Sequence, residues 1–325
     1  MADGWFTTFT NCRLCINGKL VEDQFVVSED TGKILHRTGY IGGEIVDLEE
    51  GIIAPGFLEL QTNGVNGFHF THFEDAEQYQ QRLDDTAKYY VTEGVTGFWA
   101  TIPTVSSDDF QKILPSLRPR SIPDGATLLG AHCEGPYLHP SKKGAHNEFL
   151  FQQPTTEPQT IYGEANLKNI KLCTLAPELP SSTPLIRTLT ANNTRVSLGH
   201  STATFSDGLS ALSAGATALT HVFNAMSPLH HRNPGLPGLI TAPAINNPYY
   251  SLITDGHHLD PSIATLLYRA NPAKCILITD SVELAGLPDG VYPGHAQIPQ
   301  PQEKRGALVT VAGTEIMVGG CLSLQ

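Results

Sequence analysis

The stretch "ATLLGAHCEGP", residues 126–136, is decisive for the fold because an apolar run leads directly to a carboxylate, Glu134. A charge at the end of a buried segment is costly unless it is paired or binds a metal. Gly135 and Pro136 follow, and the loop that begins there carries two lysines and His146. The meaning of Glu134 therefore depends on whether other apolar runs of the chain end in the same way.

Seven further short apolar runs, many of them β-branched, recur along the chain. They are "IIAPGFLELQ" (52–61), "GVTGFWATI" (94–102), "NIKLCTLAPE" (169–178), "RVSLGH" (195–200), "ATALTHVFNA" (216–225), "YSLITDG" (250–256) and "CILITDS" (275–281). Stretches with helical spacing, such as 75–94, 206–216 and 260–270, separate most of these runs. Eight strands that alternate with helices indicate a parallel sheet, and eight is the number that closes an α/β barrel of the (β/α)8 TIM-like type. A doubly wound open sheet is the main alternative, although no GxGxxG motif follows an early strand.

The 325 residues are enough for one such barrel and a smaller unit. Residues 1–52 have turn signals at Asn17-Gly18 and Thr31-Gly32 between β-rich runs, which predicts a small antiparallel unit, part of an incomplete β-sandwich domain. We expect the catalytic barrel over residues 53–286 and a return β segment over residues 287–325.

Composition limits the possible partners. The net charge of −12 argues against nucleic acid, since phosphate backbones require a basic face. No apolar run reaches the ~18–20 residues that span a bilayer. The six cysteines are scattered and lie mostly inside apolar runs, which is typical of free thiols in a reducing cytosol. We therefore expect a cytoplasmic protein that binds neither nucleic acid nor membrane.

In a barrel of this type, the chemistry sits at the C-terminal ends of the strands. The strand ends of this chain offer imidazoles, carboxylates and amides: Gln61, Asn63, Glu134, Glu178, His200, His221, Asp255, His257, His258 and Asp280. Two imidazoles, one carboxylate and an open position for water make a catalytic metal site, so we assign Glu134, His200 and His221 as the ligands of one divalent cation. Asp280 is the expected acid/base beside it. Zinc suits these ligands, and iron, cobalt or manganese could also occupy them.

Six stretches carry a family resemblance: "PGFLELQTNG" (55–64), "GAHCEGPYLHPSKKGAH" (130–146), "VSLGHSTAT" (196–204), "ALTHVFNAMSPLHHRNPGLPG" (218–238), "DGHHLDP" (255–261) and "ILITDSVELAG" (276–286). They resemble the N-acetylglucosamine-6-phosphate deacetylase family of the amidohydrolase superfamily. The resemblance implies metal-dependent hydrolysis of the acetamido group of N-acetyl-D-glucosamine 6-phosphate to glucosamine 6-phosphate and acetate, in amino-sugar catabolism. An amidohydrolase that acts on another amide is an alternative, but that function would not explain the stretch from residue 218 to 238.

The resemblance also implies roles for residues outside the metal set. His146 matches a catalytic histidine that contacts the sugar near the scissile amide, and Asn224 and Ala225 match residues that bond the phosphorylated sugar. His258 and Arg232 match residues that contact the phosphate. The resemblance also implies a homodimer in which Arg232 of one subunit reaches the site of the neighbouring subunit.

Other polar residues of these loops have simpler interpretations. Lys142 and Lys143 are interpreted as solvated loop charges, and the roles of Glu178, His230 and His231 stay open.

At the end of the first barrel strand, the superfamily often carries an HxH pair that holds a second metal. This chain has Gln61-Thr62-Asn63 there. Because amides are poor ligands for transition metals, we expect one ion rather than two.

Members of the family continue beyond the point where this chain stops, through a further helix and strands that complete the small β domain. The expectation is a C-terminally truncated chain in which the outer faces of the eighth and first strands lack cover. The alternative to an active deacetylase is then a catalytically inactive chain that acts only as a partner of a full-length subunit, or a non-functional fragment. All assigned site residues precede residue 281, so the sequence predicts a complete site.

Overall fold

The computed structural model describes residues 5–35, 43–243, 246–295 and 297–324. The chain forms two compact units, Met1–Gly56 and Phe57–Gln325, and each is described by itself. Every residue assigned to the site lies in the second unit. The expected domain boundaries at residues 52 and 286 stay predictions.

The first unit is a three-stranded sheet. Strands β1 (Phe6–Ile16) and β2 (Lys19–Ser28) form an antiparallel hairpin, and β3 (Glu44–Ile53) pairs with the other side of β1. Asn17 and Gly18 have φ values of 51° and 74°, as a tight hairpin turn requires, which confirms this turn signal. Strand β3 is parallel to β1, so the unit is mixed and the purely antiparallel expectation was wrong. A long connection separates β2 from β3, and such a connection permits parallel pairing.

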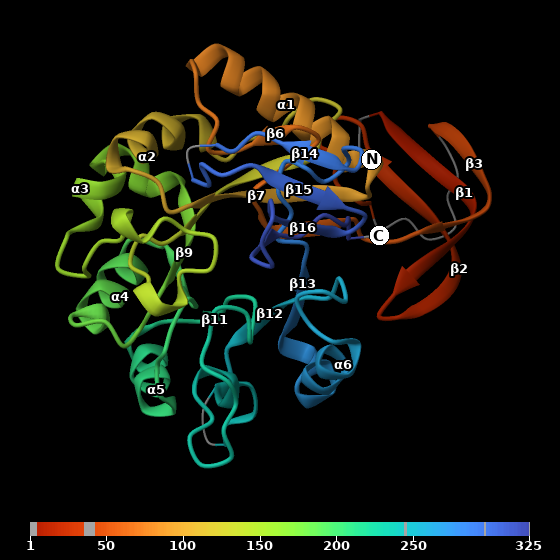
Figure 1. Ribbon diagram of the computed structural model, residues 1–325. Coiled ribbons are helices and arrows are strands. Elements are labelled where there is room, and N and C mark those ends of the chain that lie inside the picture. Colours follow the sequence, from red (N-terminus) through yellow and green to blue (C-terminus); the bar gives the residue numbers. More distant parts are fainter. Residues whose placement is uncertain (1–4, 36–42, 244–245, 296, 325) are drawn as a thin grey trace. The chain divides into compact units, whose positions relative to one another are not determined.

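The second unit contains the predicted barrel. Its eight-stranded sheet has the order β13-β12-β11-β10-β9-β8-β7-β4, with parallel pairing throughout (Figure 1). The strands are β4 (Phe57–Thr62), β7 (Val95–Pro103), β8 (Thr127–Glu134), β9 (Ile170–Leu175), β10 (Arg195–Leu198), β11 (Ala218–Leu219), β12 (Tyr249–Ile253) and β13 (Cys275–Ile278). Each of the eight apolar runs supplies one strand, so the (β/α)8 prediction is confirmed and the open doubly wound sheet is excluded.

The barrel closes at the C-terminal ends of its first and last strands. Thr62 and Ser281 form a parallel bridge there. The N–H of Asn63 donates to the carbonyl of Ser281 at 2.7 Å, and the N–H of Asp280 donates to the carbonyl of Gln61 at 3.0 Å. This seam therefore joins the two strands at the mouth of the barrel where the predicted site residues are.

Six α-helices lie around the strands in Figure 1: α1 (Ala76–Thr92), α2 (Ser107–Ile113), α3 (Pro158–Tyr162), α4 (Ser182–Ala191), α5 (Phe205–Ala214) and α6 (Pro261–Ala270). The helical predictions at 75–94, 206–216 and 260–270 are confirmed by α1, α5 and α6. The carboxylate of Asp75 caps α1 by accepting from the N–H of Gln78 at 2.9 Å. Residues at helical spacing bury one face of α1 against the barrel: Tyr79, Leu83, Ala87 and Tyr90. Short 3-10 helices span Leu114–Leu117, Pro140–Lys142, Glu148–Leu150, Glu164–Asn169, Leu236–Thr241 and Pro272–Lys274.

Two small antiparallel elements complete the second unit. The hairpin β5 (Gly64–Val65) and β6 (Phe68–His69) directly follows β4. A four-stranded sheet is formed by β14 (Gly290–Tyr292), β15 (Gln302–Arg305), β16 (Leu308–Val311) and β17 (Met317–Gly319). The return β segment therefore forms a sheet of its own, and a bridge between Ser281 and Gly320 ties its end to the seam.

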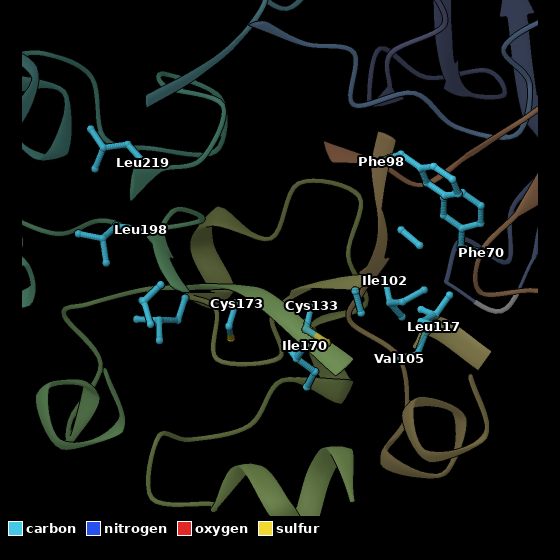
Figure 2. Packing of buried hydrophobic residues seen from close by; sticks show 14 of the residues in the cluster. Phe70, Phe98, Ile102, Val105, Leu117, Cys133, Ile170, Cys173, Leu198 and Leu219 are labelled. Carbon is cyan, nitrogen blue, oxygen red and sulfur yellow. The ribbon is translucent and has the colours of Figure 1, made fainter. Parts of the chain in front are cut away.

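The core is a continuous apolar interior. Figure 2 shows Phe70 beside Phe98, and their ring centroids are 6.1 Å apart in a stacked arrangement. Cys133 and Cys173 are fully buried in the same interior, and all six cysteines are free thiols, as predicted.

The outer faces of the two seam strands differ in their exposure to solvent. Leu277 on β13 is 51% exposed, whereas Glu59 on β4 is 1% exposed and lines a pocket with Tyr90 of α1 and Leu322 of the C-terminal segment. The expected lack of cover is therefore seen on β13 but not on β4. None of the helices in the described part of the chain has the length and apolarity needed to cross a bilayer.

Candidate active site

A cavity of about 230 Å³ opens at the C-terminal mouth of the barrel. Its walls include all but one of the residues assigned from sequence: Glu134, His146, His200, His221, Asn224, Ala225, His258 and Asp280. Residues of the C-terminal segment also contribute to the wall, namely Gln297 and Ile316–Val318. The tail therefore adds lining to the cavity, and the expectation that all residues with a role in the site precede residue 281 stays a prediction.

The three proposed metal ligands converge on one point. Glu134 is the last residue of β8, while His200 and His221 lie two residues beyond β10 and β11. The Oε1 atom of Glu134 is 3.2 Å from Nε2 of His200 and 3.0 Å from Nε2 of His221, and the two Nε2 atoms are 3.2 Å apart. Ligands bound about 2.1 Å from a tetrahedral ion are about 3.4 Å apart, so these separations match a cation site.

The ring orientations support this fit. Nδ1 of His200 lies 2.8 Å from the carbonyl of Lys142, and Nδ1 of His221 lies 3.2 Å from the carbonyl of Asn224. A carbonyl only accepts, so each Nδ1 carries its proton and each neutral ring directs the lone pair of Nε2 toward Glu134. Two facing lone pairs and a carboxylate repel one another unless a cation lies between them.

Burial and neighbouring charge shift the pKa values of Glu134 and His221 in opposite directions. Burial raises the pKa of Glu134, but when a proton rather than a cation lies between the three groups, the hydrogen bonds and positive charge that His200 and His221 then supply outweigh burial and hold the pKa well below its usual range. Burial lowers the pKa of His221, but its bond to Glu134 outweighs this and raises the pKa. The site thus favours a negative carboxylate facing positive charge, as it would face a bound cation.

Site residues occupy unusual backbone conformations. The φ values of His200, His221 and Asp280 are 49°, 30° and 47°, in the left-handed region that non-glycine residues seldom adopt. Such residues persist only where the surrounding structure fixes them, and they cluster at functional sites.

Asp280 lies between the metal ligands and two amides. Its Oδ1 accepts from Nδ2 of Asn63 at 3.0 Å and from Nε2 of Gln61 at 3.3 Å, and the Gln61 amide also donates to Glu134 at 3.1 Å. Burial, followed by the charge of Glu134, raises the pKa of Asp280 to about 6. This is the pKa range of a catalytic base that works near neutral pH.

His146 presents a hydrogen-bond donor to the cavity. Its Nδ1 accepts from the N–H of Thr104 at 3.3 Å, which leaves the proton of the neutral ring on Nε2. Burial, followed by the nearby His200, lowers the pKa of His146 to about 3. Nε2 lies 3.8 Å from Glu134 Oε2, so a neutral N–H sits beside the metal ligands without joining them.

Three of the residues assigned to the sugar and phosphate, Asn224, Ala225 and His258, line the same cavity. The Nδ2 donor of Asn224 is buried and has no partner among the described residues, as expected of a group that awaits a ligand. The carbonyl of Ala225 accepts from the N–H of Ser201 at 3.0 Å, so the backbone N–H is the group that Ala225 can offer. Nδ1 of His258 is fixed by Asp255 at 2.7 Å.

Arg232 is not part of this cavity. It is exposed on the loop after β11, where its N–H donates to Nδ1 of His230 at 3.3 Å. The single chain therefore does not bring Arg232 to the other site residues.

Several contributions were missed or left open by sequence reasoning. Glu178 accepts from Ser201 Oγ at 2.7 Å and from the N–H of Thr202 at 2.5 Å, so it holds the turn that follows His200. The ammonium of Lys142 donates to the carbonyl of Met226 at 2.9 Å, so its interpretation as a solvated charge was wrong. Neither a single threonine nor a backbone carbonyl can be recognised from sequence as a contact in the site. Of these contributions, only that of Glu178 could have been found, because it is a carboxylate at the end of a strand.

Comparisons with known proteins agree with this geometry. No family model matches the chain. N-acetylglucosamine-6-phosphate deacetylase of Danio rerio is 38% identical over 340 residues, covering 100% of this chain and 82% of the relative. The Homo sapiens enzyme of that name is 36% identical and covers 96% of this chain and 77% of the relative.

Solved structures give the same result. N-acetylglucosamine-6-phosphate deacetylase of Thermotoga maritima is 27% identical with a TM-score of 0.77, covering 97% of this chain and 81% of that one. A mutant of the Mycobacterium smegmatis enzyme in complex with N-acetyl-D-glucosamine-6-phosphate is 25% identical with a TM-score of 0.81, covering 98% and 81%. With relatives above one-third identity along nearly its whole length and their fold around the same strand ends, the chain belongs to the N-acetylglucosamine-6-phosphate deacetylase family.

Proposed function

We propose that this chain hydrolyses the acetamido group of N-acetyl-D-glucosamine 6-phosphate to glucosamine 6-phosphate and acetate, as a cytoplasmic enzyme of amino-sugar catabolism. One divalent cation, held by Glu134, His200 and His221, is required. The observation that carries the proposal is the convergence of two Nε2 lone pairs on one Glu134 oxygen at 3.0 and 3.2 Å, with Asp280 beside them. Zinc suits this ligand set, and iron, cobalt or manganese are chemically compatible with it.

Asp280 carries the proton in the proposed reaction. A cation in the three-ligand site would supply Lewis acidity toward the amide carbonyl and toward water. Because Oδ1 of Asp280 already accepts from Asn63 and Gln61, Oδ2 is the oxygen that takes the proton of the attacking water. The amine cannot leave as an anion, so Asp280 passes the same proton to the nitrogen as the C–N bond breaks.

His146 stabilises the negative charge that develops on the carbonyl oxygen. Its neutral ring keeps a proton on Nε2 because Nδ1 accepts from Thr104. A donor that is already oriented by the fold costs no reorganisation when the charge appears, which is the basis of oxyanion stabilisation.

The remaining residues would hold the substrate. The unpartnered amide of Asn224 and the N–H of Ala225 face the sugar, and His258 contacts the phosphate. Arg232 reaches the phosphate of the neighbouring site in a homodimer, since its guanidinium suits phosphate geometry and lies outside its own cavity.

A single catalytic ion is consistent with the first barrel strand. The amide groups of Gln61 and Asn63 both donate hydrogen bonds to Asp280. These N–H groups hold the aspartate in the place where a second cation would have to bind it.

Acetate release by the purified chain tests the proposal. Activity on N-acetyl-D-glucosamine 6-phosphate should disappear with a chelator and return with zinc, and unphosphorylated N-acetylglucosamine should react far more slowly. Equal rates on the two sugars would contradict the phosphate contacts. Metal-free, aggregated protein without activity would instead favour the inactive partner or fragment, and light scattering after gel filtration tests the homodimer.

A further inference from the structure

A second cavity, of about 440 Å³, lies inside the barrel. Residues of seven of the eight barrel strands line it, and among the described residues it shares no lining residue with the catalytic cavity. Its lining includes the first residues of β10 and β12, Arg195 and Tyr249, which are both exposed to solvent. The cavity is therefore reached from the N-terminal ends of the strands, whereas the proposed catalytic residues lie at the C-terminal ends.

Small side chains on three neighbouring strands open this space. Ser197 of β10, Ala218 of β11 and Ser251 of β12 all line the cavity. The interior of such a barrel is normally filled by layers of valine, isoleucine and leucine. Since a cavity of ~150 Å³ is enough to hold benzene, the space beside these three residues accommodates a ligand with one ring and a short chain.

The wall of this interior cavity offers mainly apolar contact. The hydroxyl of Ser197 lies 2.6 Å from that of Thr220, and the hydroxyl of Ser251 accepts from the N–H of His221 at 2.8 Å, so both serines are already paired. Other barrel strands contribute large apolar side chains to the wall: Leu60, Trp99, Leu172, Ile276 and Ile278. The body of a fitting ligand is therefore apolar, and the indole of Trp99 favours an aromatic ring.

A positive charge lies at the entrance of the interior cavity. Among the described residues, the guanidinium of Arg195 has neither an ion-pair partner nor a hydrogen bond. Nζ of Lys274 lies 4.2 Å from the ring centroid of Tyr249, so a second cation is present at the same end. Because a guanidinium binds a carboxylate through two parallel hydrogen bonds, the entrance suits one anionic group at the end of an apolar body.

We infer that the interior cavity binds a small aromatic monocarboxylate. The ring lies against Trp99 in the space left by Ser197, Ala218 and Ser251, and the carboxylate pairs with Arg195 at the entrance. The site is separate from the catalytic cavity, needs no substrate and stands whether or not the proposed function is correct.

Fluorescence of Trp99 reports directly on this site. The chain has two tryptophans, and Trp5 is 79% exposed in the first unit. In the full chain with Trp5→Phe, Trp99 is the remaining tryptophan, and titration with 3-phenylpropionate should change its emission saturably, with a Kd below about 1 mM. The neutral 3-phenylpropanamide should bind at least about tenfold more weakly, because it lacks the charge-assisted hydrogen bonds. No saturable change, or equal affinity for the two compounds, would overturn the inference.

Two further substitutions in the same background locate the bound carboxylate. Arg195→Gln should weaken 3-phenylpropionate binding about tenfold, whereas Arg187→Gln, a matched control exposed on α4, should leave it unchanged. Ala218→Val narrows the cavity and should weaken binding of both compounds, and the arginine pair decides alone if this variant does not fold. Equal affinity in the Arg195 and Arg187 variants would overturn the inference, and a carboxylate bound to a cation in the catalytic cavity would give that result.

Discussion

Glu59 provides a quantitative test of the buried space between the first barrel strand, helix α1 and the C-terminal segment, which it lines together with Tyr90 and Leu322. It lies on β4 and is 1% exposed. Its Oε1 accepts from the N–H of Gln61 at 3.2 Å and from the N–H of Thr279 at 3.4 Å. Burial outweighs these hydrogen bonds and raises the pKa of Glu59 to about 8 from an ordinary value of 4.5. The folded chain therefore keeps Glu59 protonated at neutral pH.

The sign of the effect on stability follows from this pKa. As pH rises above 4.5, the unfolded chain releases the Glu59 proton while the folded chain retains it up to a pH of about 8. The folded state then binds more protons than the unfolded state, so the free energy of unfolding falls as pH rises through this window. Each pH unit removes about 1.4 kcal/mol, which amounts to about 3 kcal/mol at pH 7.

The variant Glu59→Gln should remove this cost. Glutamine has the same shape, stays neutral and keeps an oxygen that can accept from Gln61 and Thr279. We expect the variant to exceed the original protein in free energy of unfolding by about 3 kcal/mol at pH 7 and by less than 1 kcal/mol at pH 5.

Urea denaturation of both proteins from pH 5 to pH 8, at constant zinc concentration, measures this difference. A gap between the two proteins that stays constant with pH would refute the argument, since only a titrating group makes the gap grow. A less stable variant at pH 7 would show that Glu59 is ionised in the folded chain.

Three further predictions concern the reaction. Asp280→Asn should lower kcat by about 10²–10⁴-fold with unchanged metal content, measured by acetate release and elemental analysis, because an amide cannot take the proton; near-normal turnover would contradict this role. Since the pKa of Asp280 is raised to about 6 and its ionised form is the base, kcat/KM should fall as pH is lowered through 6, and a flat profile down to pH 4.5 would count against it. His146→Ala should lower kcat by about 10²–10³-fold while KM changes little, and an effect on KM alone would reassign His146 to substrate binding.

The convergence of the proposed ligands could be predicted from sequence because parallel strands bring their C-terminal ends to one mouth. Glu134, His200 and His221 each end or directly follow an apolar run, so alternation of strands and helices was sufficient to bring them together. The same reasoning placed Asp280 at the seam, although the closure itself rests on a few hydrogen bonds that no sequence pattern encodes.

The supporting contacts could not be predicted in this way. The carbonyl of Lys142 orients His200, and the N–H of Thr104 sets the tautomer of His146. Backbone groups are present at every residue, so their positions depend on loop conformation rather than residue type.

The C-terminal segment contacts the site, although its sequence alone gives no indication that it packs against the barrel. The N–H of Gly320 donates to the carbonyl of Asp280 at 2.7 Å, and a Cβ at Gly320 would lie 1.9 Å from the carbonyl oxygen of Thr279. Only glycine permits so close an approach, so the "IMVGGC" run can lie against the residue that is proposed to carry the proton. Asp280 has a φ of 47°, a conformation that costs about 1–3 kcal/mol unless its surroundings fix it. In the proposed function, the barrel would hold the cation with three strand ends, while the tail fixes the proposed base beside it. Disturbing the tail contact should therefore reduce turnover before it reduces metal binding.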